Sequence, residues 1–173
     1  ACVFISGYGS NLKSLIDNSR NHNFPVNISL VITNNFKAKG LLHAKKNSIP
    51  YFIINTKRRN FENKVLNLIK KYNISLICLA GYMKIVGETI LDAFKNRVIN
   101  IHPSLLPAFK GVNAQKQALD YGVKFAGCSV HYVNDVLDGG PLILQDIVEV
   151  SDDDTEQTLS KKILKKEHII YPR

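Results

Sequence analysis

Short apolar runs recur along the chain, separated by stretches in which apolar residues come three or four positions apart. Each run is four to nine residues long, and most are rich in β-branched or aromatic residues. Runs of this length and composition are typical of buried strands. The pattern therefore predicts seven strands, at residues 2–5, 28–33, 51–54, 76–80, 98–101, 128–133 and 142–150.

Between these runs the apolar spacing changes to that of a helix. Further helices are expected over residues 114–120 and from near Asp154, where Gln157 completes a pattern resembling a capping box. Strands that alternate with helices predict an α/β fold, with an open, mostly parallel sheet and helices on both faces. The helical spacing is carried by Leu12, Leu15 and Ile16, by Leu41, Leu42 and Ala44, and by Phe61, Val65, Leu66, Leu68 and Ile69.

Length and composition are those of one globular domain, which we expect to span residues 1–173. Of the chain, 45% is apolar, enough for a sizeable core. No run approaches the roughly 18 apolar residues of a membrane helix, and the first residues resemble a strand rather than a charged leader. We therefore expect a cytoplasmic protein that binds no membrane. Cys2, Cys78 and Cys128 lie in or beside apolar runs without metal-like spacing, which predicts buried free thiols.

Charge is distributed unevenly along the chain. The net charge is +9, and residues 1–80 contain 12 Lys or Arg against 2 acidic residues. Such asymmetry can accompany binding of nucleic acids or other anions. Because no basic run is interleaved with aromatic residues, as in single-strand binders, we interpret most of the lysines as solvated surface and expect no nucleic-acid partner.

The turn at residues 6–11, SGYGSN, connects the first predicted strand to the first predicted helix. Glycines there let the backbone approach an anion, and the helix N-terminus offers unpaired N–H groups. Leu12 replaces the third glycine of a dinucleotide fingerprint and no Walker loop occurs, so a single phosphate fits better. Ser10 and Asn11 would add side-chain donors. The alternative is a tight turn in which Ser10 only caps the helix.

Asn100 and His102 lie two residues apart at the end of a predicted strand and therefore point the same way. Pro103 keeps His102 extended. Two convergent donors suit a developing oxyanion, and a protonated histidine near neutral pH needs a neighbouring carboxylate. Asp138, in the turn-rich loop at residues 134–141, is the best candidate and Asp135 competes with it.

Three further interpretations use residues near this pair. His131 either hydrogen-bonds within the cluster or is a satisfied core histidine. A zinc site of His102, His131 and Asp138 lacks the usual ligand spacing. Ser104 lacks the GxSxG context of a nucleophile and is interpreted as a turn residue. The residues alone thus indicate acyl transfer or hydrolysis through oxyanion stabilisation, without a metal or a covalent intermediate, and leave the acyl group open.

Five segments, in this order over essentially the whole chain, resemble the phosphoribosylglycinamide formyltransferase family of the folate-dependent formyltransferases. They are GYGSNL, LAGYMKIV, NIHPSLLPAFKG, GCSVHYVNDVLDGGPLILQ and KKEHIIYP. The resemblance implies a Rossmann-like formyltransferase fold and a one-carbon transferase of purine biosynthesis. It would transfer the formyl group of the cosubstrate 10-formyltetrahydrofolate to the amine of glycinamide ribonucleotide, as a monomer or homodimer and without a metal.

The resemblance also implies roles for individual residues. Asn100 and protonated His102 would hold the tetrahedral oxyanion, while Asp138 would raise the pKa of His102 and assist proton transfer from the amine. Asn113 would line the site, and His131, considered above from its position alone, would be a possible support. The ribonucleotide would meet Gly9, Ser10, Asn11 and, at its ribose, Glu167. The folate would meet Arg58, Met83, Lys84, Ile85, Val86, Asn134 and Asp135, with Lys84 standing where many members have Arg and so lacking bidentate binding of a carboxylate.

Three other functions are compatible with part of this pattern. A 10-formyltetrahydrofolate deformylase would share the NIH motif and the HYVND loop, but it has no use for a phosphate-binding turn. A methionyl-tRNA formyltransferase would need a further tRNA-binding domain, which we do not expect in 173 residues. A basic nucleic-acid-binding module would leave Asn100, His102 and Asp138 without a role.

Overall fold

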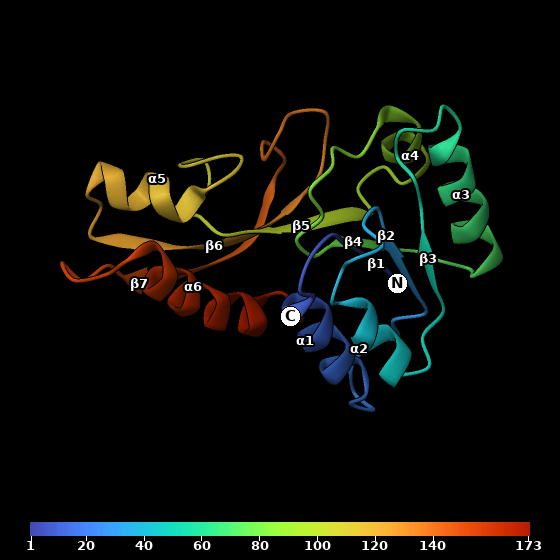
Figure 1. Ribbon diagram of the computed structural model, residues 1–173, viewed down its shortest axis with the longest axis horizontal. Coiled ribbons are helices and arrows are strands. Elements are labelled where there is room, and N and C mark those ends of the chain that lie inside the picture. The colour runs from blue at the N-terminus through green and yellow to red at the C-terminus, as the bar shows by residue number, and fades with distance from the viewer. The chain divides into compact units, whose positions relative to one another are not determined.

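Strands and helices alternate along most of the chain, as the hydrophobic pattern predicts (Figure 1). The computed structural model describes residues 1–173. Its elements are, in chain order, β1 Cys2–Ile5, α1 Ser10–Ser19, β2 Leu30–Thr33, α2 Leu41–Lys46, β3 Tyr51–Ile53, α3 Phe61–Lys71, β4 Ile77–Leu79, α4 Glu88–Ala93, β5 Val98–His102, α5 Ala114–Tyr121, β6 Phe125–Tyr132, β7 Leu142–Glu149 and α6 Glu156–Ile170.

The seven strands follow the order β3-β2-β1-β4-β5-β6-β7. β1 pairs in parallel with β2 and with β4, and β2 pairs in parallel with β3. β6 and β7 pair antiparallel, with an irregularity between Val130 and His131. The predicted open, mostly parallel sheet of seven strands is therefore confirmed. The chain packs as two compact units, residues 1–99 and 100–173, and its description as a single functional domain stays a prediction.

Within residues 1–99, β1 is buried along its whole length between β2 and β4. The order in which strands are added to the sheet reverses at β1. β2 and β3 lie on one side of β1, and β4 lies on the other. Helices α1 and α2 lie together on one face of these strands, and α3 and α4 on the other (Figure 1). Right-handed crossovers require this arrangement when the direction of winding reverses. Ligands bind such sheets outside the carboxyl ends of the strands, at the reversal.

Within residues 100–173, helix α6 packs against β6 and β7 and also contacts α5. Leu159 and Ile163 of α6 are fully buried in this contact. β6 is buried from Ala126 to His131, whereas most of β7 is exposed. In this antiparallel pair, β6 therefore belongs to the core and β7 forms the edge of the sheet.

The predicted strand boundaries differ from the observed ones by at most three residues, and one helix was missed. β6 begins at Phe125 rather than at residue 128, and its Gly127 obscured the strand pattern. A Cβ on Gly127 would lie 2.1 Å from the carbonyl oxygen of Asp146, so the close approach of β7 requires glycine there. The short helix α4 contains a single buried residue, Ile90, which is too little for a helical periodicity to appear.

The capping box of α6 is formed by a different pair from the one predicted. Thr155 is the N-cap and accepts a hydrogen bond from the backbone N–H of Thr158, whose hydroxyl accepts from the Thr155 N–H. Asp154 precedes the cap, and Gln157 takes no part in it. A hydrogen bond from Lys162, with others from Ser151 and Thr158, lowers the pKa of Asp154 to about 2.

All three cysteines are buried free thiols, as predicted. Burial raises the pKa of Cys128 to about 12 and raises that of Cys2 well above its ordinary value. Thiols with raised pKa values are poor nucleophiles at neutral pH.

None of the six helices combines the length and the hydrophobicity that a membrane crossing requires.

We predict that Gly9→Ala destabilises the fold by about 2–4 kcal/mol, whereas Gly7→Ala in the same turn costs less than about 0.5 kcal/mol. Gly9 has a φ of 77°, and a Cβ there would lie 2.5 Å from the Cα of Gly40. A Cβ on Gly7 would meet nothing within 4 Å. Urea unfolding of both variants measures the difference, and equal losses would contradict the assignment of the constraint to Gly9.

Candidate active site

Four polar side chains from three segments of residues 100–173 converge in a buried cluster. Asn100 and His102 come from β5, His131 from β6 and Asp138 from the loop that precedes β7. The His102 Nδ1 lies 3.3 Å from Asp138 Oδ2, and the His131 Nε2 lies 3.6 Å from Asp138 Oδ1. The Asn100 Nδ2 lies 3.1 Å from His131 Nε2. The two donors predicted at the end of a strand thus lie in one cluster with a carboxylate.

His102 has a hydrogen-bond acceptor on each side of its ring. Its Nε2 lies 3.0 Å from the carbonyl oxygen of Phe109, and its Nδ1 faces Asp138. A carbonyl oxygen can only accept, so Nε2 carries a proton and donates to Phe109. The nitrogen that can gain or lose a proton is therefore Nδ1, next to the carboxylate. The side chains of His102 and Asp138 are only 7% and 9% exposed, which keeps solvent screening of this pair low.

Asp138 is held in place by the backbone as well as by the two imidazoles. Its φ of 46° is left-handed, and the following glycines allow a tight reversal there, since a Cβ on Gly140 would overlap the carbonyl of Tyr132. The Gly111 N–H donates to Asp138 Oδ2 at 2.8 Å. Burial by itself would raise the pKa of Asp138, but hydrogen bonds from His131 and Gly111 and the charges of His102 and His131 lower it below its ordinary value. The carboxylate is thus ionised at neutral pH.

His131 lies between Asn100 and Asp138, with its Nε2 3.1 Å from the Asn100 Nδ2, and its supporting role stays a prediction. Its side chain is 2% exposed. Its Nδ1 donates to the Tyr132 carbonyl at 2.9 Å, so the neutral ring offers the Nε2 lone pair to an Asn100 N–H. When the ring is protonated, its Nε2–H faces Asp138 instead. In the neutral state the second N–H of the Asn100 amide is left for a ligand.

The turn after β1 has the glycine geometry expected of it, but Ser10 does not cap the helix. The N-cap of α1 is Gly9, in left-handed conformation, and no side chain caps the helix. Ser10 is the first helical residue and Asn11 the second. The first backbone N–H groups of a helix have no partner within it and carry the positive end of its dipole. The turn can therefore bind an anion through main-chain donors.

Ser6, the first residue of this turn, organises its surroundings through contacts that the sequence did not predict. Its hydroxyl donates to Asn34 Oδ1 at 2.5 Å and accepts from the Met83 N–H at 2.8 Å. The Asn35 amide donates to the Ser6 carbonyl. One side chain thus links the segments that follow β1, β2 and β4. The only signal was a small polar residue directly after a buried strand, which spacing rules do not detect.

The remaining predicted site residues differ in accessibility. Asn134 and Asp135 are exposed in the loop that carries Asp138, so Asp135 is not the partner of His102. Asn113 is exposed at the N-terminus of α5 with a φ of 57°. Arg58, Met83, Lys84 and Ile85 are exposed, whereas Val86 and Glu167 are buried. The roles that the resemblance assigns to these residues stay predictions.

The two rival chemistries gain no support from the geometry. No group of three or more His, Cys, Asp or Glu side chains is arranged to hold a metal ion. The Ser104 hydroxyl donates to the Ala108 carbonyl at 2.6 Å, as expected of a turn residue.

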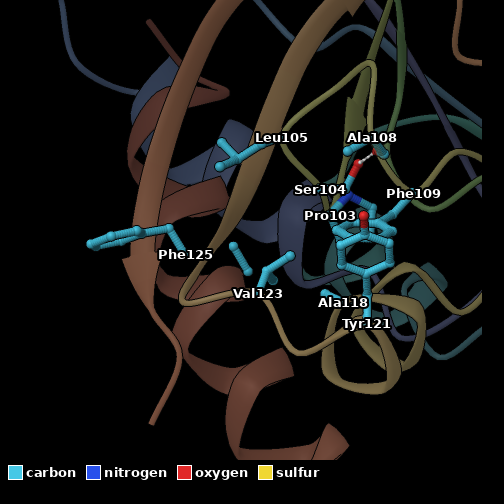
Figure 2. Close-up of a pocket in the computed structure, with 10 residues that line it drawn as sticks. Pro103, Ser104, Leu105, Ala108, Phe109, Ala118, Tyr121, Val123 and Phe125 are labelled. Atoms are coloured by element: carbon cyan, nitrogen blue, oxygen red, sulfur yellow. Dashed lines mark hydrogen bonds between the residues drawn. The ribbon is translucent and has the colours of Figure 1, made fainter.

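Beside this turn lies an apolar cavity of about 410 Å³, lined among others by Phe109, Tyr121 and Phe125 (Figure 2).

Comparison with known proteins identifies relatives over the whole chain. The trifunctional purine biosynthetic protein adenosine-3 of Homo sapiens is 42% identical, over 98% of this chain. The chain spans only 17% of the length of that relative. The phosphoribosylglycinamide formyltransferase of Bacillus subtilis is 39% identical, over 98% of this chain and 89% of its own length.

Solved structures of similar proteins have the same fold. Phosphoribosylglycinamide formyltransferase from Anaplasma phagocytophilum is 45% identical with a TM-score of 0.94, over 99% of this chain and 81% of that one. Glycinamide ribonucleotide transformylase 1 from Symbiobacterium toebii is 43% identical with a TM-score of 0.95, over 99% and 82%. The family model described as formyl transferase matches residues 1–173. The chain belongs to the formyl transferase family.

Proposed function

We propose that the chain transfers the formyl group of 10-formyltetrahydrofolate to the amine of glycinamide ribonucleotide, a step of purine biosynthesis. The observation that carries this proposal is the buried contact between His102 Nδ1 and Asp138 Oδ2, with Asn100 in the same cluster. Acyl transfer needs donors for an oxyanion and an acceptor for a proton, and these groups supply both. The names of two bacterial relatives, of whose length this chain spans 89% and 82%, support the choice of substrates.

The reaction follows from the donors in the cluster. The ribonucleotide amine attacks the formyl carbon, and the carbonyl electron pair moves to oxygen. Asn100 donates to this oxyanion through its free N–H, and protonated His102 donates through its Nδ1–H, which it shares with the adjacent Asp138 carboxylate. Collapse of the intermediate breaks the bond between the carbon and the folate nitrogen, which takes up a proton as the amine loses one. Removal of one such donor typically slows a reaction by about 10²–10³.

Asp138 has two functions in this scheme. Its ionised carboxylate holds the proton of His102 on Nδ1, the atom that faces the reaction, and it accepts the amine proton during transfer. The Gly111 N–H and the adjacent His102 favour its ionised form, because its pKa is lowered despite burial. His131 supports the set by orienting the Asn100 amide.

For the ribonucleotide, we assign phosphate binding to the main-chain N–H groups at Gly9, Ser10 and Asn11, with the two side chains as additional donors. The left-handed Gly9 and the start of a ten-residue helix support this assignment. Glu167 would accept from ribose hydroxyl groups.

For the folate, the exposed side chains of Met83 and Ile85 suit the contact with an apolar ring, while Lys84 and Arg58 suit a carboxylate tail. Val86 is buried, so it would act through its backbone. Asn134 and Asp135 would bind polar groups of the pterin, and Asn113 would line the site.

We expect 10-formyltetrahydrofolate to lose its formyl group only when glycinamide ribonucleotide is present. The absorbance of the folate product measures this loss. His102→Ala should lower turnover by about 10³ or more while folate binding, measured by fluorescence, stays close to the parent. Equal turnover with and without the ribonucleotide would identify water as the acceptor and assign the chain to a deformylase instead.

Asp138→Asn should reduce turnover by about 10²–10⁴, because the amide neither accepts the amine proton nor stabilises the proton of His102. It should also lower the free energy of unfolding at pH 7 by about 1–3 kcal/mol. A carboxyl whose pKa is lowered in the folded state stabilises above its unfolded pKa, near 3.8, and loses this effect as pH falls through the folded value. Urea unfolding from pH 7 to pH 3 should show the gap between parent and variant closing, and a gap independent of pH would contradict this.

Ser10→Asp should weaken ribonucleotide binding by about tenfold or more, since a second anion then competes for the same helix N-terminus. Asn18→Asp, near the other end of α1, adds the same charge away from the turn and is the matched control. Isothermal titration with each substrate separates the effects. Equal weakening of folate and ribonucleotide by Ser10→Asp would remove the phosphate assignment.

A further inference from the structure

A network of polar side chains, buried at Ser104 and Ser129 and exposed at Gln145, lies behind the segment that follows His102, and the reaction does not use it. Ser129 is 0% exposed and Ser104 2% exposed. The Ser129 hydroxyl donates to the Ser104 carbonyl at 2.6 Å and accepts from the Leu106 N–H at 3.0 Å. The Gln145 Nε2 lies 2.9 Å from that hydroxyl and 3.0 Å from the Leu106 carbonyl. Gln145 of β7 faces Ser129 of β6 directly across the two strands.

The network uses all of the protons that these groups offer. A hydroxyl has one proton and two lone pairs, and Ser129 engages all three. A carboxamide nitrogen has two protons, and Gln145 gives one to Ser129 and one to Leu106. Displacing the turn would leave the buried Ser129 hydroxyl unpaired, which fixes the turn on β6, and the exposed Gln145 adds a second attachment from β7. Residues 104–106 are therefore held on β6 and β7 at defined positions.

The same turn carries the carbonyl that orients His102. The Ser104 hydroxyl donates to the Ala108 carbonyl, as the dashed line in Figure 2 marks, and so closes the turn. The next carbonyl along the chain, that of Phe109, accepts from His102 Nε2 at 3.0 Å. The Phe109 ring packs edge-to-face on Tyr121, with centroids 5.9 Å apart. The position of the Phe109 carbonyl thus depends on the turn that the network anchors.

We propose that Gln145 and Ser129 are positioning residues for His102, which act through the turn of residues 104–109 and the Phe109 carbonyl. This inference rests on the proposed function and adds two residues to it. With Nε2–H held by Phe109, the ring presents Nδ1 to Asp138 and to the oxyanion. When the carbonyl moves, the ring loses the bond that selects this orientation and tautomer. The expected cost is in the chemical step rather than in substrate binding.

The sharpest test is Gln145→Glu, which keeps the shape of the side chain and removes both of its protons at neutral pH. A carboxylate there cannot donate to the Leu106 carbonyl or to Ser129, and at this exposed position it turns to water, so the turn loses its attachment to β7. We expect kcat to fall by about 10–100-fold, as for a displacement near 1 Å, with the KM of each substrate changed by less than about twofold. Gln157→Glu, exposed in the first turn of α6, is the matched control and should leave kcat unchanged.

A second readout needs no substrate. In protein labelled with nitrogen-15 at histidine, the His102 Nε2–H signal, assigned by its absence from His102→Ala, should shift or broaden in Gln145→Glu and stay in place in Gln157→Glu. If Gln145→Glu does not fold, Gln145→Met keeps the volume without introducing a charge and is measured in the same way. Ser129→Ala should lower kcat similarly and add little to Gln145→Glu, because both act through one turn.

The outcomes separate the two proposals. A parent protein without formyl transfer would remove the proposed function, while the His102 signal would still decide the positioning of the ring. An active parent whose Gln145 variants keep both kcat and the His102 signal would overturn the inference. A fall in thermal stability alone, with unchanged kcat for the folded protein, would overturn it as well, as would a fall in kcat with an unchanged signal.

Discussion

The buried carboxylate of Asp138 is the interaction around which residues 100–173 are arranged. An ionised carboxylate in a low-dielectric site is stable only with donors and positive charges around it. The chain supplies the Gly111 N–H and two imidazoles, from β5 and β6, within 3.6 Å. The left-handed backbone at Asp138 and the glycines that follow it bring the loop to that position. A single acidic residue thus determines how two strands and two loops must meet.

Residues 1–99 depend on a different constraint, which is the close approach of two backbone segments. Gly9 and Gly40 touch at a distance that leaves no room for a Cβ, and the Gly40 N–H donates to the Gly7 carbonyl. Ser6 adds hydrogen bonds to the segments after β2 and β4. These contacts give the turn after β1 a fixed shape before any ligand arrives. A preformed turn loses little conformational entropy on binding, which favours recognition of a small anion.

The fold and the centre of the candidate site were predictable because they depend on local pattern. Buried parallel strands appear in the sequence as continuous apolar runs. Side chains in a strand alternate between its two faces, so Asn100 and His102, two residues apart, point to the same face. Asp138 was identified because glycines surround it. The hydrogen bonds of His131, the bridging by Ser6 and the bonds of Gln145 depend on contacts between residues far apart in the chain, which no spacing rule contains. Thr155 replaced the predicted cap because Asp154 is engaged by Lys162 and Ser151.

The two histidines of the cluster follow one design principle. Each donates one ring N–H to a backbone carbonyl, His102 to Phe109 and His131 to Tyr132. Each therefore has a single nitrogen left to face Asp138, and its tautomer is selected by the backbone rather than by the substrate. The Tyr132 carbonyl lies at the end of β6, where the Tyr132 N–H donates to the Pro141 carbonyl, whereas the Phe109 carbonyl is only as well placed as the turn that carries it. The turn after His102 is accordingly attached to β6 and β7, through Ser129 and Gln145, at the segment just before Phe109.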